Sequence, residues 1–296
     1  MILQRLEIAQ KIHPPKWLSA SCHYLTITGS MAYGVSTDSS DWDIYGFCIS
    51  PKDNIFPHLR GEIPGFGRQI QRFDQWQQHH IDDGDKQYDF QVFSIVKFFQ
   101  LCMDNNPNMI DALFTPVNCV IHSTQIGQVV RENRKLFLHK GAWPKFKGYA
   151  YSQVHKMQIK EPPEGKRKEL VDKFGFDVKF AYHVVRLLSE VEQILTEGDL
   201  DLQRNNEQLK AIRRGEWTLE QVVQHFADKE RQLEEVYNKS KLPFGPDEAA
   251  IKALLLRCLE MHYGSLSDTI VIPGLSEIAM QKIAAICDEY GRQKCS

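Results

Sequence analysis

The sequence predicts an α+β fold, a mixed β-sheet with flanking helices followed by a mostly helical C-terminal region. Two observations lead to this expectation. In about the first 125 residues, short segments alternate apolar with polar residues at the period of two that is typical of strands. From about residue 124 onward, apolar residues recur at the spacing of helices. Strands followed by helices are typical of α+β proteins, and a boundary near residue 140 gives domains of residues 1–140 and 141–296.

Individual elements follow from local patterns. An amphipathic helix is expected at residues 4–12, before Pro14 and Pro15. A helix at residues 94–103 begins at Ser94, because a serine hydroxyl can accept from free N–H groups of the first turn. Pro107 suits the first turn of a helix at residues 109–114. The expected strands are residues 24–28, 41–49, 69–81, 88–93 and 115–121, and the later helices are residues 149–160, 174–197, 218–229 and 247–261.

Composition narrows the classes of function. The chain has 296 residues, a formal net charge of −2 and a pI near 6.6, which is not typical of strongly basic nucleic-acid binders, although a local patch could hold RNA. Seven scattered cysteines without a CxxC pair predict reduced thiols in a cytoplasmic protein and no zinc site. No apolar run reaches the length of a membrane span, and the N-terminus lacks a signal-peptide pattern, so we expect no membrane partner.

The most informative residues lie around the first two expected strands. Gly29 and Ser30 follow the first strand, and Asp41 and Asp43 open the second. Side chains i and i+2 of a strand share a face, so the two carboxylates should point the same way and repel each other unless a cation lies between them. Hard oxygen ligands suit Mg²⁺ or Mn²⁺, and a Gly-Ser turn can bind phosphate oxygens. The pattern predicts metal-assisted phosphoryl or nucleotidyl transfer; the alternative is a hairpin in which these residues only form turns.

This pattern resembles the signature of the DNA polymerase β-like nucleotidyltransferase superfamily. The resemblance implies a third carboxylate on a later strand, which completes the catalytic and metal-binding set with Asp41 and Asp43. Asp89 is the natural match, because residues 86–93 alternate as a strand does. The competing carboxylates belong to a segment that is expected to turn, with Asp85 the second choice among Asp82, Asp83 and Asp85.

Two further segments are similar to those of one subgroup of that superfamily, the nucleotidyltransferases linked to RNA repair. Residues 94–116 read SIVKFFQLCMDNNPNMIDALFTP, and residues 174–188 read FGFDVKFAYHVVRLL. With the first motif, the resemblance covers roughly residues 20–200. It implies a polymerase-β-like catalytic domain at residues 1–140, and a helical domain at residues 141–296 that completes the cleft for nucleotide and acceptor.

One face of the helix expected at residues 174–197 carries polar side chains. Lys179, His183, Arg186 and Glu190 are spaced i, i+4, i+7 and i+11, which places them on one face. The face is either an exposed stripe in water or a wall of the cleft, where its cations neutralise phosphate charge. The resemblance favours the cleft and implies that the nucleotide-binding residues are Gly29, Ser30, Lys179, His183 and Arg186. Further polar candidates on the preceding helix are Gln153, Lys156 and Lys160.

The resemblance implies a mechanism with two metal ions. Asp41 and Asp43 hold one Mg²⁺ (or Mn²⁺) at the triphosphate, and Asp89 shares a second that lowers the pKa of the acceptor hydroxyl. We expect transfer of a nucleoside monophosphate from a nucleoside triphosphate to a hydroxyl, foremost an RNA 3′ end, with release of pyrophosphate. The alternatives are nucleotidylation of a protein or small molecule, as in toxin-antitoxin or antibiotic-modifying relatives, and a non-catalytic nucleotide-binding regulator. The sequence leaves the base, the acceptor and the oligomeric state open.

Overall fold

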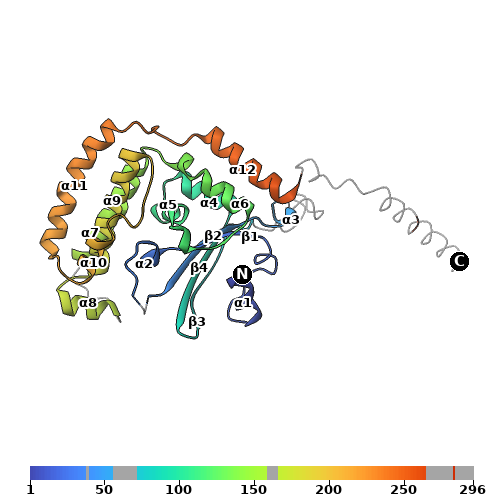
Figure 1. Ribbon diagram of the computed structural model, residues 1–296, viewed down its shortest axis with the longest axis horizontal. Helices are drawn as coiled ribbons and strands as arrows, with labels where there is room; N and C mark the ends of the chain where they lie inside the picture. Colours follow the sequence, from blue (N-terminus) through green and yellow to red (C-terminus); the bar gives the residue numbers. More distant parts are fainter. Residues whose placement is uncertain (38–39, 56–71, 159–165, 265–282, 284–296) are drawn as a thin grey trace, which may run out of the picture.

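The computed structural model describes residues 1–37, 40–55, 72–158, 166–264 and 283 of the chain. Its centre is a five-stranded sheet with the strand order β3-β4-β2-β1-β5. Helices lie beside the sheet and continue into a helical part on one side of it, as Figure 1 shows. The architecture is therefore the α+β arrangement that the sequence predicts.

The sheet is mixed in strand direction. β2 (Trp42–Cys48) runs antiparallel to β1 (Cys22–Ile27) and parallel to β4 (Lys86–Ser94). β3 (Gln75–Asp83) and β5 (Val120–Ser123) form the two edges and pair antiparallel with their neighbours. Because β2 and β4 are parallel, the first residues of both strands meet at the same end of the sheet.

Some expected boundaries of the strands were wrong. β2 begins at Trp42, so that Asp41 precedes the strand. Residues 115–121 do not form one strand, because the N–H of Cys119 donates to the carbonyl of Pro116 and closes the turn η2 (Val117–Cys119) before β5 begins. β3 begins at Gln75, later than residue 69; residues 69–71 lie outside the described part of the chain.

Among the described elements, helices cover one end of a sheet face more fully than the other. α4 (Ile95–Met103) begins at Ser94, whose hydroxyl accepts from the N–H of Lys97 as expected, and Phe98 of α4 lies 5.2 Å from Phe47 of β2 between ring centroids. α5 (Pro107–Phe114) follows, with Pro107 in its first turn. Asp43, Tyr45 and Phe47 alternate on β2 and so share this face. Phe47 is buried, whereas Asp43 and Tyr45 are half-buried, so the α4 end is covered and the Asp43 end is more open.

Shorter elements complete the N-terminal part. α1 was expected at residues 4–12 but begins and ends earlier, and α6 starts at Thr124, whose hydroxyl accepts from the N–H of Gly127. The remaining bounds are α1 (Ile2–Ile8), α2 (Gly29–Ala32), α3 (Lys52–Ile55), α6 (Gln125–Glu132) and η3 (Arg134–Phe137).

The helical part is built around α9 (Val178–Glu197), which packs against α7 (Ala142–Gln158), α10 (Asn206–Arg213) and α11 (Leu219–Lys239). The carboxylate of Asp177 accepts from the N–H groups of Lys179 and Phe180 and so starts α9. α8 (Lys166–Phe174) precedes it. α7 and α11 are longer than the sequence predicts, because packing on α9 stabilises turns that local patterns alone do not mark.

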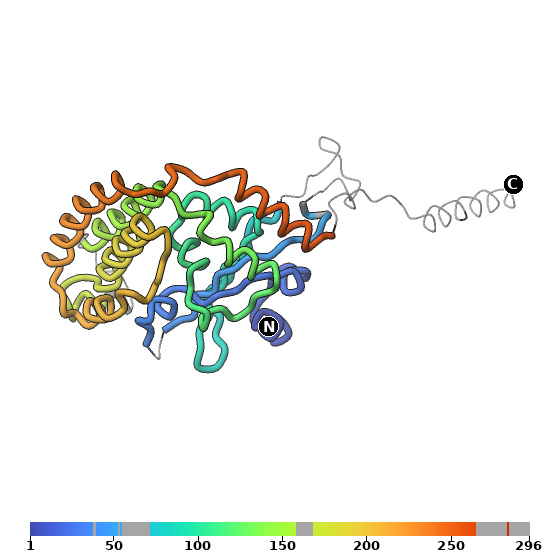
Figure 2. The backbone as a smooth tube through the Cα atoms, turned by 45° about the horizontal axis from the view of Figure 1, so that its top comes forward, coloured from blue at the N-terminus to red at the C-terminus, as the bar shows by residue number. Residues whose placement is uncertain are grey.

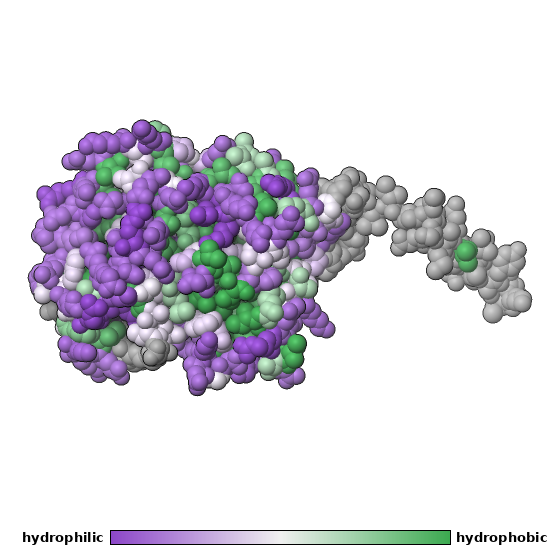
Figure 3. Space-filling view, viewed as in Figure 1, coloured by the Kyte–Doolittle hydropathy of each residue, from purple (hydrophilic) through white to green (hydrophobic). Residues whose placement is uncertain are grey.

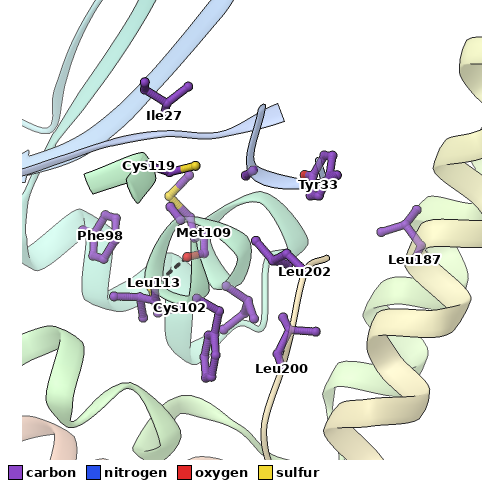
Figure 4. Packing of buried hydrophobic residues seen from close by; sticks show 14 of the residues in the cluster. Ile27, Tyr33, Phe98, Cys102, Met109, Leu113, Cys119, Leu187, Leu200 and Leu202 are labelled. Carbon is purple, nitrogen blue, oxygen red and sulfur yellow. Dashed lines mark hydrogen bonds between the residues drawn. The ribbon is translucent and has the colours of Figure 1, made fainter. Parts of the chain in front are cut away.

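A continuous apolar core joins the two parts. The connection after α9 contributes Leu200 and Leu202, both buried. Figure 4 shows these side chains between Leu187 of α9 and the side chains of α5, where Met109 and Leu113 are labelled. This core packs the sheet part against α9.

The last described helix, α12 (Glu248–Tyr263), returns to the sheet part. It contacts α4, α6 and η3, and His262 Nδ1 lies 2.9 Å from His23 Nε2 of β1. Figure 2 shows the orange-to-red segment crossing from the helical part to the sheet part. The division at residue 140 stays a prediction. α12 follows this boundary in the sequence, yet it packs on elements that precede the boundary.

Candidate active site

The Gly-Ser turn is attached directly to β2. The N–H and the hydroxyl of Thr28 both donate to the carbonyl of Asp43, at 2.7 and 3.1 Å. Gly29 follows with a φ of +64°, and a Cβ atom at this position would lie 2.4 Å from Asp43 Oδ2. Only glycine satisfies both conditions, since other residues rarely adopt this backbone and would collide with the carboxylate. Ser30, half-buried, follows in α2, so the turn expected from the sequence stands beside the Asp43 carboxylate.

Asp43 and Asp89 are brought together by strand register. They are direct partners in the parallel pair of β2 and β4, and adjacent strands lie about 4.8 Å apart. Asp41 stands one residue before β2 and is exposed. Its position differs from the expected place within the strand, because the β2–β4 pairing begins at Trp42.

The charges of several neighbouring groups act on Asp43. Burial raises the pKa of Asp43, and the neighbouring charges of Asp89 and Asp41 raise it further, whereas Lys179 and His79 act in the opposite direction. Ionised carboxylates at this end of the sheet therefore repel one another, and the cations near them only partly offset the repulsion.

The side chain of Asp89 also holds a bulge in β3. The register of β3 shifts between Gln78 and Ile81, and His80 within the shift has a φ of +55°. Asp89 Oδ1 accepts from the N–H of His80 at 2.7 Å, and His79 Nδ1 lies 3.6 Å from Asp89 Oδ2. Nothing in the sequence pattern indicated this bulge or the approach of His79, because a one-residue shift in pairing depends on the neighbouring strand.

The competing carboxylates lie elsewhere on the β3–β4 hairpin. Asp83 binds Arg5 and Lys11, at 2.6 and 2.8 Å. Asp82 accepts from the amide of Gln87, and Asp85 lies in the turn between the strands. Asp89 is thus the acid of this segment that register places beside Asp43.

Helix α9 begins near the carboxylates. Lys179 lies in its first turn, is exposed, and its charge acts on Asp43. His183 lies one turn later, half-buried, with its ring 4.3 Å from that of Tyr182 between centroids. The first residue of the predicted stripe therefore belongs to the site electrostatically.

The end of the same stripe is buried, which differs from both interpretations of the sequence. Arg186 is 5% exposed and its guanidinium donates to Asp111 and Glu190. The hydroxyl of Tyr33, just after α2, donates to Asp111 at 2.6 Å, and Arg186 lies 4.3 Å from the centre of the Tyr33 ring. We call Arg186, Asp111, Glu190 and Tyr33 the buried network. Arg186 is thus engaged inside the protein, where it joins α9 to α5 and to the end of α2.

Burial dominates the protonation of the buried network. It raises the pKa of Glu190 well above its ordinary value, against the opposing charge of Arg186. Burial also raises the pKa of Asp111, which Arg186 and the Tyr33 hydroxyl pull down again. Two carboxylates share one guanidinium, and removing that guanidinium would leave both without a cation partner in the interior.

Tyr45 is a site residue that the sequence reasoning missed. It follows Asp43 by two positions on β2 and so shares its face. Burial and the charge of Asp43 raise the pKa of Tyr45 to about 12, with smaller effects from Asp111 and Asp89. The phenol of Tyr45 therefore stays neutral on the same face of β2 as Asp43. The alternation of β2 could have indicated its position, but not its contacts.

The donor set fits a hard divalent cation, although the carboxylates are not gathered around a point. Among the described residues, no three His, Cys, Asp or Glu side chains stand close enough to hold a metal ion. Asp89 is turned toward the N–H of His80. The mutual repulsion that raises the pKa of Asp43 is the kind that a cation relieves, and oxygen ligands of this type suit Mg²⁺. Asp41, Asp43 and Asp89 are the residues that would hold it.

Comparison with known proteins decides the family. Residues 2–257 match the model of the RNA repair pathway DNA polymerase beta family, RlaP. This protein belongs to that family. The match confirms the resemblance found in the sequence, and membership in a polymerase β-like nucleotidyltransferase family indicates nucleotidyl transfer as the kind of chemistry.

Other comparisons add little to the RlaP assignment. A search of curated proteins found no match. Among solved structures, the chain is similar to a nucleotidyltransferase-like protein from Exiguobacterium sibiricum 255-15, with 9% identity and a TM-score of 0.29, covering 98% of this chain and 90% of that one. With a TM-score this low, the assignment rests on the family model.

The surface of this RlaP family member is mainly hydrophilic around the helical part. In Figure 3, purple side chains cover most of that side of the molecule, and green side chains gather near the middle of the face shown. Within the described ranges of the chain, no helix combines the length and the apolar character needed to cross a membrane.

Proposed function

We propose that this protein transfers a nucleoside monophosphate from a nucleoside triphosphate to the 3′ hydroxyl of an RNA, with release of pyrophosphate. One observation carries the proposal: Asp43 and Asp89 are register partners at the open end of a sheet, and Gly29 stands against the Asp43 carboxylate. Phosphate oxygens at the turn would therefore lie next to a pair of metal-binding carboxylates. The family assignment supports the RNA acceptor, since its description names RNA repair.

Each part of the site has a role in this proposal. Bound Mg²⁺ (or Mn²⁺), held by Asp41, Asp43 and Asp89, would supply charge stabilisation and a lowered pKa for the acceptor hydroxyl. Gly29 and Ser30 offer backbone N–H groups and a hydroxyl to the β- and γ-phosphates.

The polar residues on this face of α9 contribute in different ways. Lys179, exposed and acting on Asp43, neutralises phosphate charge in the proposal, and His183 lies on the same face one turn later. Arg186 has a positioning role, because its charge is used by Asp111 and Glu190 and its side chain packs on Tyr33 at the end of α2. It supports the turn that carries Gly29 and does not reach the phosphates itself.

The test is transfer of label from each of the four α-³²P nucleoside triphosphates. The protein is incubated with Mg²⁺ or Mn²⁺, short RNAs and cell extract, beside the Asp41→Asn/Asp43→Asn variant. Label on RNA that the double variant abolishes is the expected result, and it names the base. Label on a protein or a small molecule would replace RNA as the acceptor. Triphosphate binding without any transfer would mean that the protein is a nucleotide-binding regulator, and the proposal would be wrong.

A further inference from the structure

One face of α7 carries a row of exposed residues that the site described above does not use. Lys145, Tyr149, Ser152 and Lys156 are spaced i, i+4, i+7 and i+11, so they form a single stripe along the helix. All four are exposed, Tyr149 to 37%. We call them the α7 stripe. The sequence of α7 contains no Asp or Glu, so its charged residues are all basic.

The opposite flank of α7 has the same residue types but a different environment. Lys147 lies 2.7 Å from Glu230 and 3.0 Å from Glu234 of α11, and the hydroxyl of Tyr151 donates to Glu230 at 3.1 Å. The lysine charge on this flank is thus neutralised within the protein. Among the residues that the structure describes, neither lysine of the α7 stripe forms an ion pair.

Two residues of the α7 stripe lie near groups of the candidate active site. The hydroxyl of Tyr149 accepts from the side-chain amide of Asn106, the N-cap of α5, at 3.1 Å. Tyr149 also contributes to the raised pKa of Tyr45, which shares the face of Asp43, so the two phenols lie near each other. At the other end, the ammonium of Lys156 is 5.7 Å from the ring of Phe180, the residue after Lys179. The middle of the stripe thus lies near the face of β2 that carries Asp43, and its Lys156 end lies beside the first turn of α9.

A depression opens beside the exposed tyrosine ring. It has a volume of about 380 Å³, and its lining residues are Pro144, Lys145, Gly148, Tyr149 and Ser152. This volume lies within the range of roughly 300–1,000 Å³ that is typical of small-molecule sites. Gly148 adds no side chain to the wall of the depression. A Cβ atom built at Gly148 would meet nothing within 4 Å, so the space beside it is open.

We propose that the α7 stripe binds the unpaired 3′ segment of the acceptor RNA, with a base on the ring of Tyr149 and phosphates at Lys145 and Lys156. Single-stranded nucleic acids are held by aromatic rings that stack with bases and by cations along the backbone. An acidic protein would use the lysines but would need neither the exposed ring nor the depression. The choice of RNA as the ligand rests on the proposed function. That the ligand is an unpaired strand rests on the geometry of the α7 stripe.

The first experiment measures RNA binding without nucleotide or metal, so that it does not depend on catalysis. The probe is a fluorescein-labelled, unstructured 12-nucleotide RNA, followed by fluorescence anisotropy. Tyr149→Ala should raise the Kd about 5- to 100-fold, the range expected for loss of one stacked base. Tyr149→Phe, which loses the bond to Asn106 but keeps the ring, should bind as the native protein does. Tyr151→Ala, on the opposite flank, is the matched control and should leave the Kd unchanged.

The lysines are tested through the salt dependence of the same Kd. Each phosphate contact in single-stranded nucleic acid contributes about 0.7 to the slope of log K against log salt. Lys145→Ala and Lys156→Ala together should lower the slope by about 1.4. Lys147→Ala makes the same change of charge per residue on the neutralised flank, and should leave the slope unchanged.

A third experiment blocks the depression with little risk to the fold. Gly148→Glu adds a carboxylate where the structure has open space, and should weaken RNA binding through repulsion of the backbone. Gly148→Ala adds only a methyl group at the same position, and should leave RNA binding unchanged while the melting temperature stays the same or rises. Thermal melting of both variants shows that the fold is retained.

The outcomes separate this inference from the proposed function. If the native protein binds RNA through the α7 stripe but transfers no nucleotide, the proposed function fails and the inference stands. The inference is overturned if the native protein does not bind the probe, or if Tyr149→Ala and Tyr151→Ala have equal Kd values. It is also overturned if polyglutamate competes with RNA as well as unlabelled RNA does while Tyr149→Ala has no effect, since the surface would then recognise acidic chains in general.

Discussion

Two clusters of charged side chains lie along one face of α9, and they differ in how their charges are balanced. At the first turn, the charge of Lys179 acts on Asp43, beside Asp89, and these groups are partly open to solvent. Two turns later, Arg186 binds Asp111 and a second carboxylate in the interior. The first cluster has an excess of negative charge; in the second, Nη1 of Arg186 donates to both carboxylates.

The difference teaches how burial assigns a role to a charge. An excess of carboxylates is tolerated at the open cluster because water and an added cation can compensate it. In the interior the same excess is costly, so burial raises the pKa of Glu190 and of Asp111, and a fixed guanidinium offsets part of the cost. Equal spacing on one helix face therefore gives a candidate site residue at Lys179 and a buried ion-pair partner at Arg186.

The largest effect is expected for Asp43→Asn, which should lower transfer without lowering stability. Nucleotidyl transfer should fall by at least about 10³-fold, because a carboxylate that would hold the proposed metal ion is lost. The melting temperature should not fall, and at pH 7 it should rise, since the raised pKa of Asp43 shows that its ionised form is unfavourable in the folded state. Transfer assays and calorimetry on the same preparation check both.

The pH dependence gives the control for that variant. A carboxyl group whose pKa is raised on folding costs stability once it ionises, so the advantage of Asp43→Asn should be present above the folded pKa. It should vanish below the unfolded pKa of about 3.9, where both states are protonated. A variant less stable than the native protein at pH 7 would contradict the description of the open cluster.

Arg186→Met should instead lower the stability of the protein. Removing the guanidinium leaves Asp111 and Glu190 buried without a cation, and breaking a buried pair in this way costs about 3–5 kcal/mol. Urea unfolding should show this loss in the free energy of unfolding. Adding Asp111→Asn and Glu190→Gln to the variant should restore most of the stability, because the uncompensated charges are then absent. If the triple variant stays as unstable as Arg186→Met, the loss comes from packing on Tyr33 and not from charge.

These two clusters also show what the sequence could predict. The strand periods and the Gly-Ser turn were enough to place Gly29 near Asp43, since the contact is local in the sheet. Choosing Asp89 over Asp85 needed only the alternation of β4, and the register of β4 makes it the neighbour of Asp43. Motifs formed by neighbouring strands are thus accessible from residue patterns.

Contacts between distant elements were not accessible in the same way. Spacing placed Lys179 and Arg186 on one face of α9, but the depth of each depends on how α5 and α2 pack against that helix. The bulge that brings His79 to Asp89 depends likewise on a pairing shift in β3. Periodicity gives the face of an element, whereas burial and register shifts are decided by its neighbours.

Gly29→Ala should have a smaller effect on stability than Arg186→Met but should still lower transfer. Alanine at this position would have to adopt a positive φ, and its methyl group would meet Asp43 Oδ2. We therefore expect a loss of about 1–3 kcal/mol in the free energy of unfolding and a displacement of the carboxylate. Gly148→Ala, in open space on α7, is the control and should gain about 0.5–1 kcal/mol. Equal changes in the two unfolding curves would show that the contact with Asp43 is not what constrains Gly29.

The smallest effect is expected for Lys179→Gln, and it tests whether the open cluster works through charge. Lys179 is exposed, so the free energy of unfolding should change by no more than about 0.5 kcal/mol. The KM for the triphosphate should rise roughly tenfold, as expected for the loss of one partly screened phosphate contact. Lys179→Arg keeps the charge and should restore the KM, while the KM of the glutamine variant should depend less on salt. An unchanged KM in Lys179→Gln would mean that the phosphates bind away from α9. The clusters at Lys179 and Arg186 would then differ in burial but not in a role for nucleotide binding.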